Sequence, residues 1–337
     1  MSIEESLLTP ERVREYLSRL GLVANSRQIS VSELGGGVSN VVFLIEGGDL
    51  RWVLKQSLAK LRVKDDWRSD RDRIFREAEA IQVLRDLLGN GEVPDVIYLD
   101  REHFLLIMTA APVGAIPWKD LLLKGQVDLA MARQAGEVLA RIIAGSRLSP
   151  HFRELFLDRR IFDQLRITPY YRTTAARDPD VRLALEQLIS DSWNTRTSLV
   201  HGDYSPKNML VCERKMFLID FEVVHWGDPA FDAGFLLTHL LLKAFHRPQL
   251  AHSYLEAARE FWKALDLGLK AEMTPEFESM TIRHLGGLML ARIDGKSPVE
   301  YIVDENSKER VRRLGKSVLL EPPRSLGALM ESVYKKL

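Results

Sequence analysis

The sequence has little of what marks a secreted or nucleic-acid-binding protein. Its 337 residues include a single cysteine, Cys212, so no disulfide can form within the chain. Lys and Arg number 47, and Asp and Glu also number 47, so the basic excess that usually accompanies binding to phosphate backbones is missing. The first ten residues carry acidic side chains and no apolar run, unlike a secretory signal peptide.

Long hydrophobic runs are also missing. The longest relevant uncharged stretch, residues 104–118, is interrupted by Pro112 and Pro117, whereas a membrane-spanning helix needs about 20 apolar residues. With 46% hydrophobic and 28% charged residues, the composition is that of a globular protein. We therefore expect a soluble, cytoplasmic protein that binds neither nucleic acid nor membrane, and the composition leaves its oligomeric state open.

The first third of the chain has the pattern of a small sheet with one inserted helix. β-rich segments bounded by glycine and polar turns predict strands near residues 29–34, 41–45, 51–55, 95–99 and 104–108. Ile74, Ala78 and Ile81 fall at helical spacing and predict a helix over residues 71–88. A further helix is expected to begin at Pro10, with Thr9 as its N-cap.

Helical patterns dominate from Trp118 to the end, with one strand-like cluster between residues 199 and 221. The sequence therefore predicts an α+β protein of two lobes. We expect a sheet lobe over residues 1–108, a hinge at 109–113, and a larger helical lobe over 114–337.

The segment His201-Gly202-Asp203 is followed by Asn208 and then by Asp220-Phe221-Glu222. A single carboxylate in a loop can orient a hydroxyl nucleophile and accept its proton, so Asp203 is the candidate catalytic residue. Hard metal ions bound to nucleotide phosphates prefer oxygen ligands, so we expect Asn208, Asp220 and Glu222 to hold Mg²⁺. The alternative is that these Asp and Asn residues only cap turns.

The segment Gly35–Asn40 lies between two predicted strands. Backbone N–H groups in such a loop can approach phosphates closely, which makes Gly36, Gly37, Ser39 and Asn40 candidate nucleotide-binding residues. The alternative is a plain hairpin turn.

Lys55 follows Val53 and Leu54 in a predicted strand, and it is a candidate ligand of the donor phosphates. Glu77 shares the apolar face of the predicted helix with Ile74 and Ile81, so we expect Glu77 rather than Glu79 to orient this lysine. The alternatives are that Lys55 protects a sheet edge and that Glu77 forms a surface pair with Arg73.

Taken in order, these motifs resemble the aminoglycoside phosphotransferase/choline kinase superfamily, whose fold is protein-kinase-like. The resemblance covers roughly residues 30–300, and it includes Arg76-Glu77-Ala78 and the stretch from Gly227 to Asp232. The Asp-x-Glu form of the metal motif resembles that of methylthioribose and choline/ethanolamine kinases. The resemblance implies ATP or GTP as donor, with its base at the backbone of Met108 to Ala110, and it implies that Asp232 braces the catalytic loop.

The resemblance implies a phosphotransferase that moves the γ-phosphate to a hydroxyl of an aminoglycoside, a sugar or an amino alcohol. A non-catalytic nucleotide-binding module of the same fold is the alternative, although a degenerate module would usually lack one of the motifs. A protein kinase is disfavoured because Ser205 stands where such enzymes have lysine and Glu222 where they have glycine.

Three further residues are candidates for the acceptor site: Trp226, Arg292 and Lys296. For Trp226 a core position is the preferred alternative, and for the two cations the alternative is surface charges at a helix end. The segment 294–297, Asp-Gly-Lys-Ser, is not expected to be a P-loop, because the stretch before it has a helical pattern.

Overall fold

The computed structural model describes residues 7–24, 28–35, 37–63 and 66–336. The chain forms two compact units, Met1–Pro112 and Val113–Leu337, called here the N-terminal and C-terminal units. Within the described residues, no helix is long and apolar enough to cross a membrane. That residues 109–113 act as a hinge stays a prediction.

The N-terminal unit is built around one sheet and two helices. Its elements are α1 (Pro10–Arg19), β1 (Ser30–Leu34), β2 (Asn40–Gly47), β3 (Leu50–Ser57), α2 (Arg73–Leu88), β4 (Val96–Asp100) and β5 (Leu105–Thr109). Helix α1 begins as predicted, because the Thr9 hydroxyl accepts a hydrogen bond from the Arg12 N–H (3.4 Å).

The five strands pair antiparallel in the order β1-β2-β3-β5-β4. Strands β2 and β3 form a hairpin in which Gly47 pairs with Leu50, so the tight turn sets the register that pairs Val42 with Lys55. Apolar side chains of β1, β2 and β3 pack with α1 into one core that includes Val13, Leu17 and Phe43. The predicted strands and helices of this lobe are confirmed, with ends shifted by one or two residues.

The C-terminal unit is mainly helical. Its longer helices are α4 (Leu129–Arg147), α8 (Arg182–Asn194), α9 (Ala230–His246), α10 (Ala251–Leu269), α11 (Pro275–Asp294), α12 (Glu305–Leu320) and α13 (Leu326–Lys336). Shorter helices are α3 (Trp118–Leu123), α5 (Pro150–Leu155), α6 (Arg160–Phe162), α7 (Thr173–Arg177) and the single turns η4 (Pro179–Val181), η5 (Pro206–Asn208), η6 (Pro248–Leu250) and η7 (Lys270–Glu272). Its strands are β6 (Ile116–Pro117), β7 (Ser198–Val200), β8 (Met209–Cys212), β9 (Lys215–Leu218) and β10 (His225–Gly227).

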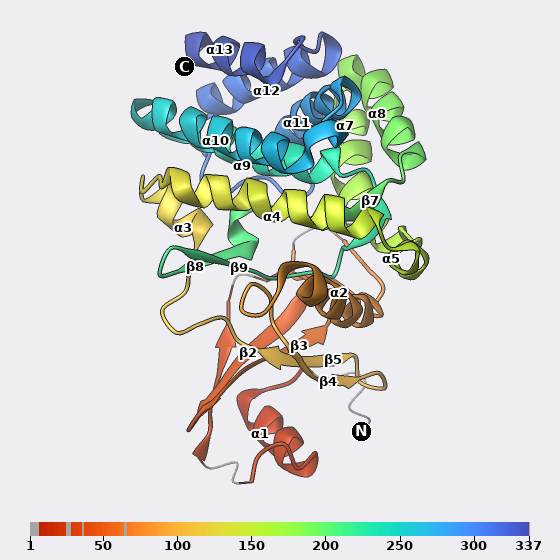
Figure 1. Cartoon of the computed structure of the whole chain (residues 1–337), viewed down its shortest axis with the longest axis vertical. Helices are drawn as coiled ribbons and strands as arrows, with labels where there is room; N and C mark the ends of the chain where they lie inside the picture. Colours follow the sequence, from red (N-terminus) through yellow and green to blue (C-terminus); the bar gives the residue numbers. More distant parts are fainter. Residues whose placement is uncertain (1–6, 25–27, 36, 64–65, 337) are drawn as a thin grey trace. The chain divides into compact units, whose positions relative to one another are not determined.

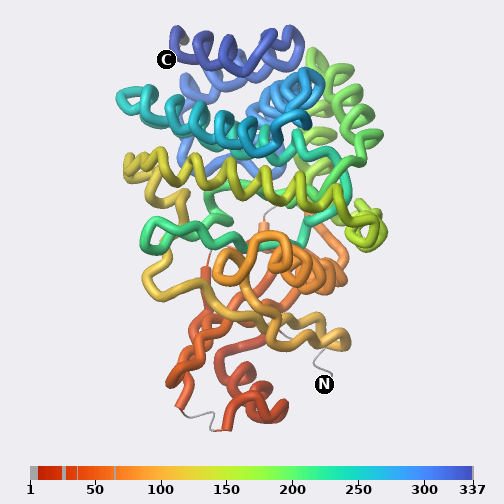
Figure 2. The backbone as a smooth tube through the Cα atoms, in the orientation of Figure 1, coloured from red at the N-terminus to blue at the C-terminus, as the bar shows by residue number. Residues whose placement is uncertain are grey.

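Helix α9 is the centre of this unit. Every residue from Ala230 to Phe245 is buried, as expected of a helix that is apolar on all sides. Helices α4 and α10 run side by side, and both pictures of the chain show this pairing (Figures 1 and 2). The predicted α+β class, with a small antiparallel sheet lobe and a larger helical lobe, is confirmed.

Three features of the C-terminal unit were not predicted. Ile116–Pro117 adds a third strand to the β8–β9 hairpin, and Ser198–Val200 pairs with His225–Gly227. Residues Asp163–Arg172 form a π-helix, η3, that contains Pro169. Proline has no N–H for the usual helical hydrogen bond, so a widened turn is a way to continue the helix past it. Short strands and a widened turn leave no periodic signal in a sequence.

The close packing of α4 on α10 depends on Gly136. A Cβ atom on this residue would meet the Phe261 carbonyl oxygen and lie 2.8 Å from the Ala264 Cβ. We predict that Gly136→Ala lowers the free energy of unfolding by about 1–3 kcal/mol, although alanine is the better helix former. Chemical denaturation measures this change.

Gly327→Ala in α13 is the matched control, because the nearest atom to its Cβ would be the Ser325 Oγ at 3.7 Å. We expect this variant to be as stable as the wild type or more stable by up to about 1 kcal/mol. Equal effects of the two substitutions would contradict the proposed packing constraint.

Candidate active site

In the N-terminal unit, the Lys55 ammonium on β3 donates a hydrogen bond to the Glu77 carboxylate on α2 (2.6 Å). Both residues are buried, with exposed fractions of 6% and 0%. The predicted pairing is therefore confirmed, and Glu77 does not form a surface pair. Glu79 instead faces Arg101 at 3.6 Å, with both side chains exposed. A buried ion pair contributes little net stability, because the cost of desolvating both charges offsets their attraction. The Lys55–Glu77 pair is therefore better explained by a functional role than by a contribution to stability.

The predicted phosphate loop ends where β2 begins. Gly36 lies outside the described residues; Gly37 and Ser39 precede the strand, and Asn40 is its first residue. The Ser39 carbonyl accepts hydrogen bonds from the Leu58 N–H (3.1 Å) and from the Arg73 guanidinium. Arg73 is fully buried and also donates to the Leu58 carbonyl (2.8 Å). The end of the loop is thus fastened to α2 by an arginine that sequence reasoning had considered only as a partner of Glu77.

The segment predicted to bind the nucleotide base lies at the end of β5. Met108 is buried in this strand and pairs with Val53. The Ala110 N–H donates to the Arg51 carbonyl (3.0 Å), so this residue would offer a ligand its carbonyl oxygen rather than its N–H.

In the C-terminal unit, the loop that carries Asp203 is held by a buried carboxylate. Asp232, in the first turn of α9, accepts hydrogen bonds from the backbone N–H groups of His201 (2.6 Å) and Gly202 (2.9 Å). Gly202 has φ +75°, and a Cβ there would lie 2.7 Å from the Val223 Cγ1, so this turn requires glycine. The expectation that Asp232 braces the loop is confirmed.

Asp203 lies between two cations. Its carboxylate, 3% exposed, is 2.9 Å from the Arg166 guanidinium and 2.8 Å from the Lys207 ammonium. Burial favours the neutral carboxyl, but the charges of Arg166 and then Lys207 outweigh it and hold the pKa of Asp203 well below its ordinary value. The side chain is therefore ionised at physiological pH.

Arg166 was missed by sequence reasoning. It comes from the π-helix η3, and its guanidinium also donates to the Gly202 carbonyl (2.6 Å). A buried arginine in an apolar segment, Leu165-Arg166-Ile167, is the only sequence signal for such a role. Lys207 lies inside the recognised motif, four residues after Asp203, yet its charge was not considered.

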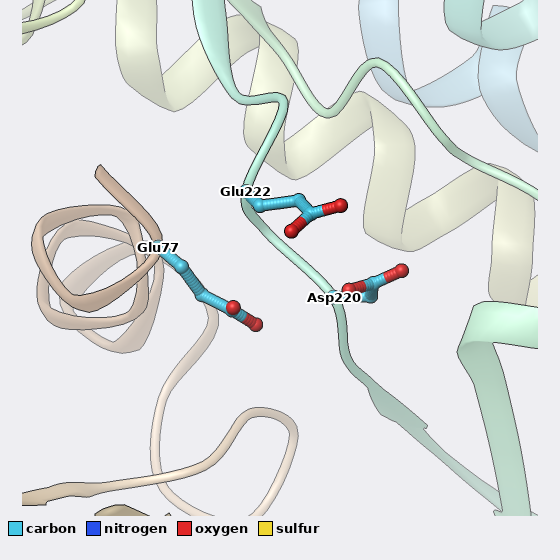
Figure 3. Close-up of side chains that lie close together, drawn as sticks. All are labelled: Glu77, Asp220 and Glu222. Atoms are coloured by element: carbon cyan, nitrogen blue, oxygen red, sulfur yellow. The ribbon is translucent and has the colours of Figure 1, made fainter. Parts of the chain in front are cut away.

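The three predicted metal ligands follow the same loop. Asn208 ends the turn η5, and its amide nitrogen donates to the Asp203 carbonyl (3.0 Å), so its Oδ1 oxygen is the atom suited to a metal. Asp220 and Glu222 extend from one segment after β9 (Figure 3), and each has a carboxylate oxygen within 4.8 Å of the other's. Asp220 has φ +72°, a conformation that Asp tolerates better than most residues and that often occurs at functional sites. Two carboxylates and an amide oxygen fit a hard cation such as Mg²⁺.

His201 lies beneath the loop rather than at its surface. One ring nitrogen accepts from the Asp203 N–H (3.2 Å), and the other is 3.2 Å from the Ile219 carbonyl, which only an N–H can satisfy. Burial lowers the pKa of His201 to about 4, so the ring is neutral at physiological pH. These two contacts hold the His201 ring beneath the loop and help to fix its conformation.

The three predicted acceptor residues lie in different surroundings. Trp226 is buried in β10, and its indole N–H donates to the Arg196 carbonyl (3.0 Å), which fits the core interpretation. Arg292 donates to the Tyr170 hydroxyl (3.2 Å) and to Ser297. Lys296 is half-buried, and its backbone N–H donates to the Pro169 carbonyl (3.0 Å). The segment 294–297 follows helix α11 rather than a strand, so it is not a P-loop.

Residues 30–267, more than half of the chain, match the phosphotransferase enzyme family. The chain belongs to this family. The recognition made from the motifs is therefore confirmed, and the described loop of Asp203 lies within the matched part of the chain.

Curated relatives are named methylthioribose kinases. This chain is 28% identical over 265 residues to one from Pectobacterium carotovorum subsp. carotovorum, an alignment covering 70% of this chain and 66% of that one. It is 24% identical over 245 residues to methylthioribose kinase 2 of Oryza sativa subsp. japonica, covering 64% and 57%. The chain thus spans about two thirds or less of the length of these relatives.

Solved structures show the same fold at low identity. A choline/ethanolamine kinase family protein from Mesorhizobium loti has a TM-score of 0.55 at 18% identity, covering 96% of this chain and 99% of that one. Amicoumacin kinase, solved with AMP-PNP, Ca²⁺ and its antibiotic, has a TM-score of 0.58 at 14% identity, covering 96% and 98%. At these identities the likeness concerns the fold alone.

The neutral state of His201 predicts an acid sensitivity. The pKa of His201 is about 4 in the folded chain against 6.5 for a free histidine, so only the unfolded chain binds this proton between those values. The free energy of unfolding should therefore fall as the pH falls from about 6.5 to about 4, by up to about 1.4 kcal/mol per pH unit from this residue. Denaturant unfolding from pH 7.5 to 4.5 measures it.

His201→Gln should flatten this dependence relative to the wild type, while His151→Gln, at an exposed position, should leave it unchanged. Parallel curves for the wild type and His201→Gln would show that His201 does not carry the effect.

Proposed function

We propose that this chain is a kinase that transfers the γ-phosphate of ATP or GTP to a hydroxyl group of a small molecule. The observation that carries the proposal is the setting of Asp203, a buried carboxylate that is held in place by its loop and flanked by two cations. In this proposal Asp203 orients the acceptor hydroxyl and takes up its proton as the bond to phosphorus forms.

The low pKa of Asp203 limits what this residue can contribute to the proposed phosphate transfer. A carboxylate held strongly ionised by Arg166 is a weak base, so its main effect is to align the hydroxyl, and it accepts the proton late in the transfer. Arg166 and Lys207 both contact Asp203, so in this proposal they lie beside the phosphoryl group during its transfer. Their positive charges would stabilise the negative charge of that group.

Asn208, Asp220 and Glu222 are the residues that would hold Mg²⁺. The ion, when bound with nucleotide, neutralises phosphate charge. The chain's own contribution is the oxygen donor set, in which the hydrogen bond from Asn208 to the Asp203 carbonyl ties a metal ligand to the position of the base.

The donor phosphates would be held by Lys55, kept in place by Glu77, and by the loop that contains Gly36, Gly37, Ser39 and Asn40. The nucleotide base would bind at the backbone of residues 108–110. In this proposal residues 1–108 serve the nucleotide, residues 114–337 serve the acceptor, and residues 109–113 are the hinge.

The family includes kinases of small molecules, and the curated relatives are methylthioribose kinases. A sugar hydroxyl is therefore the first acceptor to examine, ahead of aminoglycosides and amino alcohols. A screen of a metabolite library for phosphate transfer, with ATP and with GTP, tests the function directly.

We predict that Asp203→Asn lowers kcat by at least about 1,000-fold, because an amide can neither accept the proton nor carry charge. Nucleotide binding, measured by calorimetry, should change little. The matched control is Asp266→Asn, an exposed carboxylate on α10, which should keep full activity. Near wild-type turnover by Asp203→Asn would remove this residue from the catalytic role.

We also predict that Glu222→Gln raises the Mg²⁺ concentration for half-maximal activity by at least about 10-fold, because a buried carboxylate of the donor set loses its charge. Activity titrated with Mg²⁺ at fixed nucleotide measures this. Glu213→Gln, at an exposed turn between β8 and β9, is the control. An unchanged Mg²⁺ requirement in Glu222→Gln would mean that this residue does not serve the metal.

A further inference from the structure

Beyond the catalytic loop, the C-terminal unit contains a group of cations that has no matching set of carboxylates. Its central member is Arg292, near the end of α11. The Arg292 guanidinium donates to the Tyr170 hydroxyl (3.2 Å) and to the Ser297 Oγ (2.9 Å). Within the described part of the chain, no carboxylate forms an ion pair with Arg292, and its buried Nε atom has no hydrogen-bond partner.

Tyr170 connects this arginine to the catalytic loop. The guanidinium of Arg292 lies 5.7 Å from the centre of the Tyr170 ring, and that of Arg166 lies 5.6 Å from the same centre. Arg166 in turn contacts the Asp203 carboxylate. Arg166 and the Tyr170 ring therefore link the proposed base to Arg292 through a continuous series of contacts.

Helix α9 adds a second cation. Phe235, His239 and Lys243 are spaced four residues apart and so share one face of α9. The Phe235 ring stacks on the ring of Tyr170 in η3, with ring centres 6.0 Å apart. This face of α9 therefore packs against η3. Lys243 is completely buried, and its ammonium donates to the His239 carbonyl (3.2 Å). No ion pair to Lys243 occurs among the described residues.

Tyr301 completes the group. The chain turns back after α11, and the Val299 N–H donates a hydrogen bond to the Arg292 carbonyl (2.8 Å). This turn places Tyr301 beside Lys243. The Lys243 ammonium lies 5.3 Å from the centre of the Tyr301 ring. The Tyr301 hydroxyl is buried without a hydrogen-bond partner. Buried donors that lack acceptors are rare in folded proteins and need an explanation.

The local charge balance points the same way. Burial, and then the positive charges of Lys119 and Arg292, lower the pKa of Lys243 to about 7. Glu300 opposes this shift, but it is itself paired with Lys119. Burial, Arg292 and Lys243 likewise hold the pKa of His239 well below its usual range. Positive charge is therefore in excess on this side of the Asp203 loop.

From this group we propose that the acceptor carries an anionic group, a carboxylate or a phosphate, in addition to the hydroxyl that receives the γ-phosphate. Arg292 binds the anion, assisted by Lys243 and the Tyr301 hydroxyl. Arginine suits this task because its planar guanidinium presents two donors to a carboxylate or a phosphate. The proposal rests on the proposed function, and it narrows the acceptors to one chemical class.

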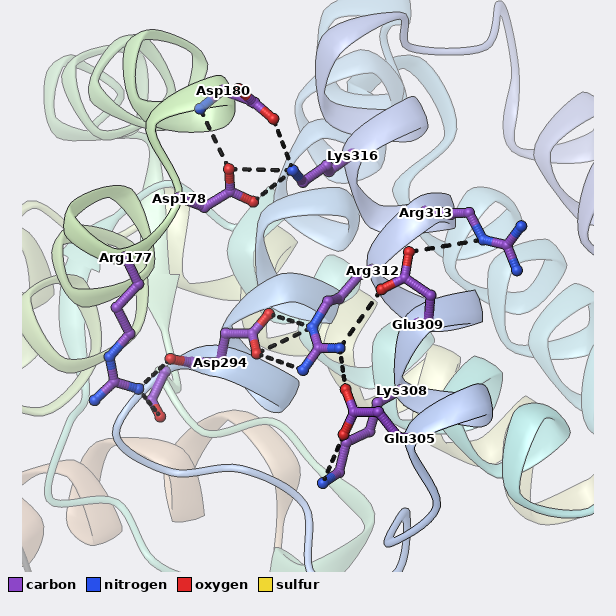
Figure 4. Close-up of polar contacts among 11 residues, drawn as sticks. Arg177, Asp178, Asp180, Asp294, Glu305, Lys308, Glu309, Arg312, Arg313 and Lys316 are labelled. Carbon is purple, nitrogen blue, oxygen red and sulfur yellow. Dashed lines mark hydrogen bonds and ion pairs between the residues drawn. The ribbon is translucent and has the colours of Figure 1, made fainter.

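The structure also explains how Arg292 would be kept in position. Asp294, two residues later, accepts three hydrogen bonds from the Arg312 guanidinium (2.9, 3.0 and 3.1 Å), and its carbonyl accepts from Arg177. Figure 4 shows these contacts joining the end of α11 to α12 and α7. The end of the helix is therefore fastened from both sides, so an acceptor would meet a preorganised arginine.

The test compares acceptors that share hydroxyl groups and differ in charge: glycerol with glycerate, glucose with gluconate, ribose with ribose 5-phosphate, and choline as a cationic probe. Phosphate transfer and calorimetric binding are measured for each. We expect kcat/KM for at least one carboxylate or phosphate probe to exceed that of its neutral partner by at least about 10-fold. The two anionic types distinguish carboxylate from phosphate recognition.

Arg292→Gln should raise the KM of the preferred anionic probe about 30-fold and leave the KM of the nucleotide within about 2-fold, because one charged hydrogen-bonding partner is lost. Arg292→Lys should recover part of this loss. Arg313→Gln, on the exposed face of α12, is the control and should behave as the wild type. If Arg292 only holds Ser297, its substitution will lower the melting temperature without a selective change in the acceptor KM.

The outcomes separate the two proposals. If phosphate is transferred only to neutral or cationic probes and Arg292→Gln does not affect this transfer, the proposal of an anionic acceptor is wrong. The proposed kinase function then still stands. Binding of anionic probes that depends on Arg292, with no transfer to any acceptor, keeps the anion site and overturns the kinase. If no acceptor is phosphorylated and no binding of an anionic probe depends on Arg292, both proposals are wrong.

Discussion

The loop that carries Asp203 depends on one buried carboxylate. Asp232 accepts the N–H groups of His201 and Gly202, two backbone donors that no strand or helix would otherwise satisfy. Asp232 is itself fixed because α9 is buried along its length, so it has no freedom to follow a moving loop. The left-handed turn at Gly202 leads directly into Asp203, and the Arg166 guanidinium contacts both the Gly202 carbonyl and the Asp203 carboxylate.

The contacts around Asp203 fix the position of its carboxylate and at the same time make it a weak base. A general base works best when its pKa is near the working pH, yet Arg166 and Lys207 lower the pKa of Asp203 far from that range. The same cations make the carboxylate rigid and keep it charged, which suits a reaction whose barrier is reduced chiefly by alignment and by compensation of phosphoryl charge. In the N-terminal unit, Glu77 fixes the Lys55 ammonium in the same way, and this would place the lysine for the phosphates in the proposed function.

The sequence predicted those features that depend on local pattern. Helical spacing selected Glu77 over Glu79, and strand and turn residues located the sheet within one or two positions. Arg166 and Arg73 were missed because their partners, at Asp203 and Ser39, lie more than thirty residues away in the chain. The π-helix that carries Arg166 has no periodic signature, and Trp226 shows that residue type alone does not separate a core aromatic from a ligand-binding one.

In the proposed function, the residues that choose an acceptor differ from those that transfer phosphate. The motifs from Lys55 to Glu222 would handle groups that every donor nucleotide and metal ion shares, so they identify a family and say nothing about the acceptor. Arg292, Lys243 and Tyr301 lie outside those motifs, on α11, α9 and the segment that follows α11. Their donors are buried or half-buried without matching carboxylates, an arrangement that costs stability unless something else supplies the negative charge. We propose that the acceptor itself supplies this charge, which would account for a fold that tolerates such a cost near Asp203.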